Sequence, residues 1–124
     1  MKVLKYQGRK VYTQGNTEVK TSDLTSADNR SGQLTDAYFF EVDGDRMTHK
    51  IDFDRKKVED ISSGLMVEIN VKSRGTAGVS IVGLQRIVDF MSDFDCMDKN
   101  LSTLKGKRVY TYNRGMHLLG FSKA

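Results

Sequence analysis

Two short segments near opposite ends of the chain combine cations with tyrosines at strand spacing. They are GRKVYT at residues 8–13 and GKRVYT at residues 106–111. Alternate side chains of a strand share one face, so the first segment places Lys10 beside Tyr12. The second segment places Arg108 beside Tyr110 and Tyr112. Because cations hold phosphates and flat rings stack on bases, each face has the composition of a surface for single-stranded nucleic acid.

The expected nucleic-acid contacts are the cations and tyrosines of these two segments and of the turn after the second. They are Arg9, Lys10, Tyr12, Lys107, Arg108, Tyr110, Tyr112 and Arg114. The alternative interpretation is that tyrosine and flanking Lys or Arg are simply favourable strand residues. The two segments are not an internal duplication, because the residues around them do not match.

A second candidate lies in KSRGTAGVS at residues 72–80, which we expect to connect a strand to a helix. Backbone amides at a helix N-terminus favour anions, and glycines let a phosphate approach closely. Secondary phosphate contacts are therefore expected at Lys72, Arg74 and Gly75. The spacing is neither that of a P-loop nor that of a dinucleotide-binding fingerprint. Two alternatives remain, a plain flexible connection and a site for a small phosphorylated ligand.

The charge distribution along the chain favours a polyanionic partner. The net charge is +4, but residues 1–20 carry five bases and one acid, and residues 99–124 carry six bases and no acid. Residues 21–98 carry nine bases and fifteen acids. If the two basic ends meet in space, they form one face that attracts polyanions such as nucleic acid. The alternative is that the basic ends are only solvated.

The residue types that could support catalysis or bind a metal lack the required spacing. In the segment 68–72, Asn70 stands where a metal-dependent nuclease would need a second acid. His49 and His117 fall in separate predicted hairpins without metal-ligand spacing. Cys96 has no base near it in sequence, and no Gly-x-Ser-x-Gly motif is present. We therefore expect a protein that is not an enzyme and holds neither a metal nor a cofactor.

The length and composition indicate one soluble domain spanning residues 1–124. Hydrophobic residues make up 38% of the chain, and no apolar run approaches the length of a membrane span. The N-terminal residues lack the apolar core of a signal peptide. The single cysteine excludes an internal disulfide. Together these features predict a cytoplasmic protein without membrane contact.

Alternation of apolar and polar residues predicts most of the secondary structure. The expected strands lie near residues 2–14, 37–42, 46–53, 65–73, 107–112 and 116–122, with turns at 43–45 and 113–115. A short helix is expected near 55–63, and a main helix near 81–95 with Ser80 as its N-cap. The polar residues 15–36 predict a long loop, which a short strand at 17–21 would interrupt.

This order of elements predicts an α+β fold. The expected architecture is an antiparallel sheet of five or six strands, with the main helix near 81–95 across one face and the short helix near 55–63. The alternative is a small OB-like barrel with its helix between strands.

The C-terminal third resembles the ends of many small uncharacterised phage and mobile-element proteins. The resemblance rests on a helix followed by LKGKRVYTY and a hairpin ending in HLLGFS. It implies a gene product that acts in a bacterial cytoplasm, on DNA metabolism or on a host protein, and it implies no site residues.

Taken together, the sequence predicts a non-enzymatic accessory protein that binds nucleic acid. We expect it to bind single strands, with single-stranded DNA as the first candidate, or the phosphate backbone without sequence readout. The alternative is a small phage-type protein that binds and inhibits a host protein through an exposed sheet edge or apolar patch. In that case the contacts would lie in the loop 15–36 and the acidic segment 21–60.

Overall fold

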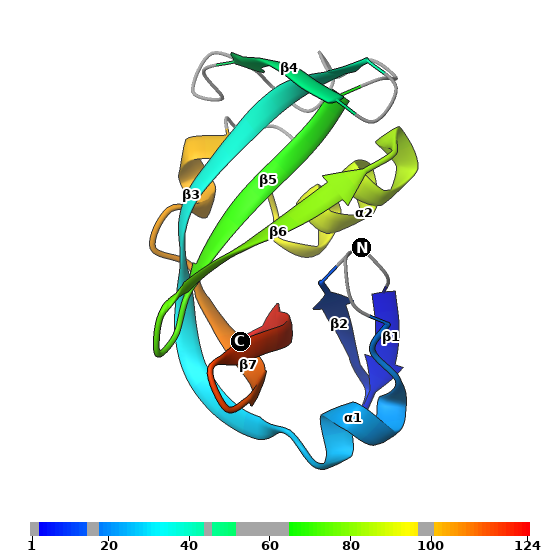
Figure 1. Ribbon diagram of the computed structural model, residues 1–124, viewed down its shortest axis with the longest axis vertical. Helices are drawn as coiled ribbons and strands as arrows, with labels where there is room; N and C mark the ends of the chain where they lie inside the picture. Colours follow the sequence, from blue (N-terminus) through cyan, green and yellow to red (C-terminus); the bar gives the residue numbers. More distant parts are fainter. Residues whose placement is uncertain (1–2, 15–17, 44–45, 52–64, 97–100) are drawn as a thin grey trace.

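The computed structural model describes residues 3–14, 18–43, 46–51, 65–96 and 101–124 (Figure 1). Its strands are β1 (Val3–Tyr6), β2 (Arg9–Thr13), β3 (Asp28–Asp43), β4 (Arg46–Ile51), β5 (Leu65–Lys72), β6 (Thr76–Val82), β7 (Arg108–Arg114) and β8 (His117–Lys123). Its helices are α1 (Thr21–Thr25), α2 (Leu84–Asp93) and the 3-10 helix η3 (Leu101–Leu104). None of the helices in these residues is long and apolar enough to cross a bilayer.

All described strands belong to one antiparallel sheet. Their order is β1-β2-β8-β7-β3-β5-β6, and β4 pairs with the far end of β3. The α+β class is therefore confirmed, but the expected number of five or six strands is wrong, because the sheet has eight. The OB-like alternative is also wrong, because β1 and β6 lie at opposite ends of the order and do not close a barrel.

The long strand β3 joins the two halves of the sheet. Its first half pairs with β7 and its second half with β5, and Gln33 is the residue opposite both Arg108 and Lys72. Gly32 precedes Gln33, at the point where the strand paired with β3 changes from β7 to β5. A Cβ added there would lie 2.6 Å from the Lys72 carbonyl oxygen and 2.7 Å from a methyl carbon of Thr111. Only glycine fits where β3 passes so close to both neighbours.

The expected loop at 15–36 is wrong over most of its described length. Residues 21–25 form α1, and β3 already begins at Asp28. The first half of β3 has polar side chains and no continuous apolar face. It stays in the sheet because its backbone pairs with β7. A strand of this kind lacks the alternation that indicates strands in a sequence.

The extended N-terminal segment is a hairpin rather than one strand. Strands β1 and β2 pair from Val3–Tyr12 to Tyr6–Arg9. The two residues between them, Gln7 and Gly8, have φ values of 51° and 76°. Positive φ at both central residues is the geometry of the two-residue turn that fits the twist of a hairpin.

The main helix is shorter than expected and begins later. Helix α2 starts at Leu84, and Gly83 precedes it with a φ of 97°. Ser80 is not its N-cap, because Ser80 lies in β6 opposite Glu68. Residues 72–80 are consequently a hairpin between β5 and β6 rather than a connection from strand to helix. The β-branched residues before Gly83 favour this strand.

The other expected elements have mixed outcomes. The β3–β4 and β7–β8 hairpins are confirmed by their registers. The strand expected near 65–73 is β5, in which Val67, Ile69 and Val71 are buried on one face and Met66 is buried as well. The short helix expected near 55–63 lies outside the described residues.

Buried side chains form two clusters on opposite faces of the sheet. The larger cluster packs α2 and η3 against one face, which we call the core face, and includes Tyr12, Val67 and Phe90. The smaller cluster lies on the other face, which we call the outer face, where Leu24 of α1 contacts Val11 and Tyr112. Among the described helices, α1 is the one that packs on the outer face, so a surface site can form there away from α1.

Candidate nucleic-acid interface

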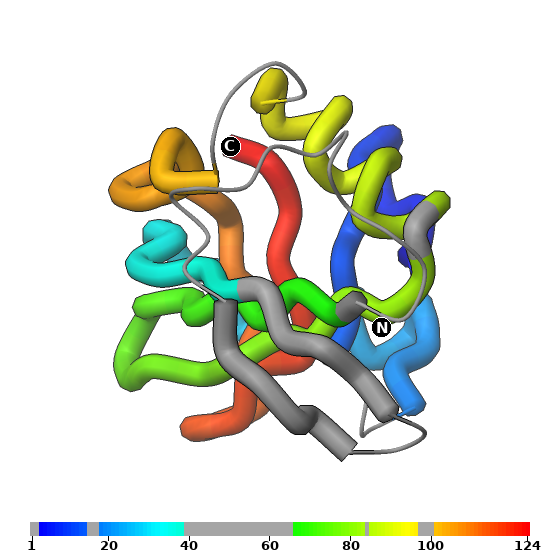
Figure 2. Tube along the Cα trace, turned by 90° about the horizontal axis from the view of Figure 1, so that it is seen from above, coloured from blue at the N-terminus to red at the C-terminus, as the bar shows by residue number. Residues whose placement is uncertain are grey.

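The two similar segments lie on either side of β8. Strand β2 pairs with β8 through Val11 and Ser122, and β7 pairs with β8 through Tyr110 and Ser122. Figure 2 shows β8 near the centre of the molecule with β7 and β2 flanking it. The two basic ends of the chain therefore do meet, at a separation of one strand.

The two segments nevertheless present their tyrosines to opposite faces. Val11, Ser122 and Tyr110 form one row across the sheet, so their side chains share the outer face. Tyr12 is the next residue after Val11 and points to the core face. The expected surface combining Tyr12 with Tyr110 is therefore wrong.

Tyr12 belongs to the hydrophobic core and is 1% exposed. Its ring centroid lies 5.1 Å from that of Phe90 and 5.5 Å from that of Phe121. Its hydroxyl donates a hydrogen bond of 2.7 Å to Asp93 of α2. Burial, reinforced by Asp93, raises the pKa of Tyr12 above its ordinary value, so the hydroxyl stays protonated and keeps donating. No base can stack on this ring.

Tyr112 is also unavailable, although it lies on the outer face. It is 3% exposed and packs in the cluster beneath α1, edge to face with Tyr6 at 6.0 Å. Its hydroxyl lies 3.4 Å from that of Ser122. The strand position of Tyr112 was predicted correctly, but α1 covers its ring.

Tyr110 is the one predicted tyrosine that reaches the surface. It is half-buried in β7, and the guanidinium carbon of Arg9 lies 4.4 Å from its ring centroid. This cation–π contact fixes both side chains at the surface of the sheet. Because Arg9 is exposed, its guanidinium can also take part in stacking with a base.

A row of polar side chains lies next to Tyr110 where β7, β3 and β5 meet. Arg108, Gln33 and Lys72 are direct neighbours across these strands, so their side chains share the outer face. Two strand spacings separate the backbones of Arg108 and Lys72 by about 10 Å. With Ser31 and Ser73, these residues line a shallow depression of about 340 Å³.

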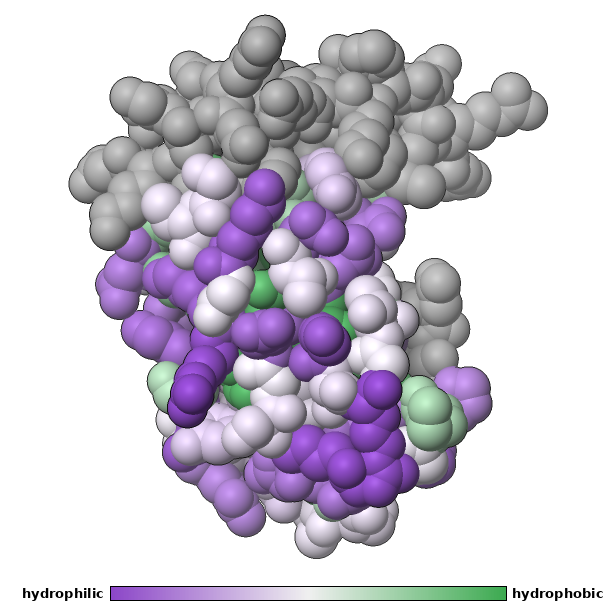
Figure 3. All heavy atoms as spheres, turned by 90° about the vertical axis from the view of Figure 1, so that its left-hand side faces the viewer, coloured by the Kyte–Doolittle hydropathy of each residue, from purple (hydrophilic) through white to green (hydrophobic). Residues whose placement is uncertain are grey.

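The cations of this row are free to bind an anion. Arg108 and Lys72 are both exposed, and neither has an ion-pair or hydrogen-bond partner among the described residues. In the described part of the side along which β3 runs, large hydrophilic areas alternate with areas of intermediate hydropathy, and apolar areas are small (Figure 3). This surface can accept phosphates without first breaking an internal salt bridge.

Two other predicted cations, Lys107 and Arg114, have partners within the protein. Lys107 donates a hydrogen bond from Nζ to the carbonyl oxygen of Phe94, at the end of α2. Arg114 forms an ion pair of 2.7 Å with Asp23. The pKa of Asp23 is lowered, first by the backbone amide of Lys20 and then by Arg114. Both cations have structural contacts that an external phosphate would have to replace.

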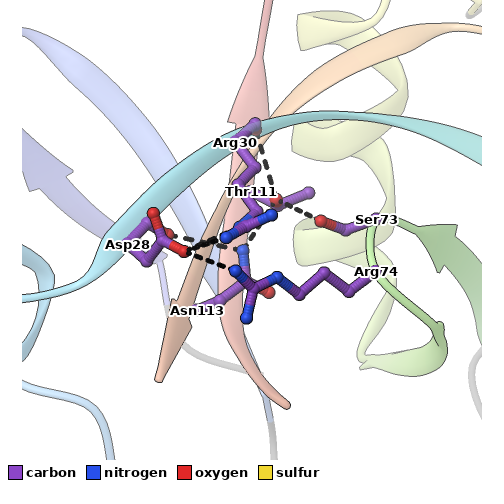
Figure 4. Close-up of polar contacts among 6 residues, drawn as sticks. All are labelled: Asp28, Arg30, Ser73, Arg74, Thr111 and Asn113. Atoms are coloured by element: carbon purple, nitrogen blue, oxygen red, sulfur yellow. Dashed lines mark hydrogen bonds and ion pairs between the residues drawn. The ribbon is translucent and has the colours of Figure 1, made fainter. Parts of the chain in front are cut away.

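Arg74 belongs to a polar group on the core face (Figure 4). Its guanidinium lies 3.6 Å from the Asp28 carboxylate, which Arg30 already holds at 2.6 Å. Beside them, the Thr111 hydroxyl lies 3.0 Å from that of Ser73. Arg74 therefore lies apart from the row on the outer face.

Two more predicted contacts lie away from the row. Gly75 is exposed in the β5–β6 turn, with no helix N-terminus beside it. Lys10 is exposed and, with Asp93 and Lys123, lines a separate hollow of about 410 Å³.

The sequence analysis did not identify Gln33, which lies in the row, or Ser31, which lines the same depression. Both lie in the polar stretch interpreted as a loop, and no pattern distinguishes them there. Within the described part of the chain, no group of three or more His, Cys, Asp or Glu side chains could hold a metal ion.

No family model, curated protein or solved structure matches this chain.

Proposed function

We propose that this protein binds single-stranded nucleic acid on the outer face of its sheet, without catalysing a reaction. Arg108 and Lys72 hold consecutive stretches of the phosphate backbone, and a base stacks on the Arg9–Tyr110 pair. The observation that supports this most is the row of Arg108, Gln33 and Lys72, whose two cations lack partners among the described residues and lie beside that pair.

Single strands are favoured over duplexes because stacking requires an unpaired base. Tyr110 and Arg9 provide a planar surface at one end of the row, and the cations provide sequence-independent contacts. Single-stranded DNA is the first candidate ligand. The resemblance of the C-terminal third to small phage and mobile-element proteins supports a role in DNA metabolism in a bacterial cytoplasm.

The charge contribution is tested by replacing Lys72 and Arg108 with Ala together. Each cation that neutralises a phosphate of a single strand contributes about 0.7 to the slope of log K against log salt. The double variant is therefore expected to bind more weakly, with a slope reduced by about 1.4. Fluorescence anisotropy with a labelled single strand at several salt concentrations measures both quantities.

A matched control is Arg86→Ala, which removes one exposed cation from α2 on the other side of the sheet. It should leave the slope unchanged, whereas Arg108→Ala alone should lower it by about 0.7. Equal effects of Arg86→Ala and Arg108→Ala would mean that overall charge, rather than this row, attracts the ligand.

A further inference from the structure

In the described part of the chain, the edge strand β6 has a strand neighbour on one side only and lies beside an apolar groove. Among the described strands, β6 pairs only with β5. A groove of about 400 Å³ extends from Ala77 of β6 to the end of the β7–β8 hairpin. Met116, Leu118 and Leu119 form most of its apolar lining. A smaller hollow of about 50 Å³, also lined by Ala77, Met116 and Leu118, continues it toward the β5–β6 turn.

The edge lacks the features with which proteins prevent strand pairing. Edge strands are commonly protected by charged residues or proline. The sequence of β6, TAGVSIV, contains neither. The other two strands at the margin of the sheet do carry charges, Lys5 in β1 and both Arg46 and Lys50 in β4. Among the described edge strands, β6 is the one without a charged residue, which favours pairing with a further strand.

An exposed apolar side chain marks the same region, because Met116 is 75% exposed at the rim of the groove. Ala77 lies on the core face, opposite Val71, and its small side chain leaves the groove open next to the strand. A strand added along β6 would direct alternate side chains into this space.

The charges around the groove select an acidic partner. Arg114 lines the groove but already forms an ion pair with Asp23, whereas Arg74 lines the adjoining hollow, and neither lining contains a carboxylate. Arg74 shares the single carboxylate of Asp28 with Arg30, so this part of the rim carries excess positive charge. Acidic side chains of a partner would be attracted to it.

We propose that β6 and this groove bind an extended peptide segment of a partner protein by strand addition. The peptide backbone pairs with the edge of β6 that no described strand occupies, an apolar side chain enters the groove beside Met116 and Leu118, and an acidic side chain pairs with Arg74. This binding mode joins backbone pairing to a side-chain pocket. It uses none of Arg9, Arg108 or Tyr110, so it is independent of the proposed nucleic-acid interface.

The test is selection of a displayed library of random dodecapeptides on the immobilised full-length protein. Enriched peptides are expected to alternate apolar residues and to carry acidic residues near the apolar ones. Their affinities are measured by fluorescence polarisation. An enriched peptide is then made in two versions, with methyl groups on the odd-numbered or on the even-numbered backbone nitrogens. One version should lose binding and the other should keep it, because only one edge of the added strand faces β6.

Two variants of the protein test whether the peptide binds in this groove. Met116→Asp introduces a like charge at an exposed position and should weaken binding at least tenfold without changing the melting temperature. Ala77→Leu should fill the groove and weaken binding similarly. Arg108→Ala is the control and should bind the peptides as the wild type does.

Three outcomes would overturn the proposal. The first is that no peptide is enriched, and the second is that the enriched peptides lack acidic residues. The third is that Met116→Asp binds an enriched peptide as the wild type does and that both methylated versions of the peptide bind as the unmethylated one does. Because Met116→Asp leaves the outer face intact, it should also bind a single-stranded oligonucleotide normally, which separates this proposal from the other.

Discussion

Replacing Tyr12 with Ala is expected to destabilise the protein by about 3–5 kcal/mol, the usual cost of removing a large buried aromatic side chain. The ring joins β2 to α2 and β8 through Phe90, Phe94 and Phe121. Since small domains are stable by only about 5–15 kcal/mol, much of the stability depends on this side chain. Urea denaturation followed by circular dichroism measures the change.

Tyr12→Phe separates the ring from its hydroxyl. It removes the hydrogen bond to Asp93 but keeps the packing, so the expected loss is about 1 kcal/mol. Tyr12→Phe should bind an oligonucleotide as the wild type does. A Tyr12→Ala variant that kept its stability but lost nucleic-acid binding would instead place this ring on the binding surface.

Replacing Tyr110 with Ala is expected to weaken binding of single strands by about 1–3 kcal/mol, or roughly five- to 150-fold. The change removes the ring against which Arg9 is held. Both the stacking surface and the position of the guanidinium are therefore lost. Titration with a labelled single strand, together with a denaturation midpoint for each variant, distinguishes lost contacts from lost folding.

Tyr110→Phe is the matched control, because it retains the ring and the contact with Arg9. It should bind within about twofold of the wild type, since the stacking surface is unchanged. If Tyr110→Ala also bound like the wild type, the Arg9–Tyr110 pair would be only a structural contact.

Elements with clear alternation were predictable from the sequence. The buried side chains Val67, Ile69 and Val71 identified β5, and the turn residues near Gly115 identified the β7–β8 hairpin. The polar first half of β3 was not predictable, because its neighbours rather than its own side chains hold it in the sheet. The start of α2 was misplaced because Ile81 fits both a helical stripe and the buried face of β6.

Residue types singled out part of the site, namely Arg9, Lys72, Arg108 and Tyr110. That these four side chains share one face was not predicted, because strand spacing placed Lys10 rather than Arg9 beside a tyrosine and Lys72 belonged to a separate candidate site. When the two similar segments are aligned by sequence, Val11 matches Val109. In the sheet, however, Val11 lies in the same row as Tyr110. This offset of one residue turns Tyr12 to the core, because side chains alternate between faces. A sequence fixes alternation within a strand but not the register between strands.

The most direct test of the central claim is titration of the wild-type protein with a labelled single strand of about 20 nucleotides and with the matching duplex, across a salt series. The interface predicts micromolar or tighter binding of the single strand at about 50 mM salt, weaker binding of the duplex, and a slope of log K against log salt of about −1.4 to −2 for two or three phosphate contacts. Absence of binding at that salt concentration, or equal and salt-independent binding of both ligands, would contradict it.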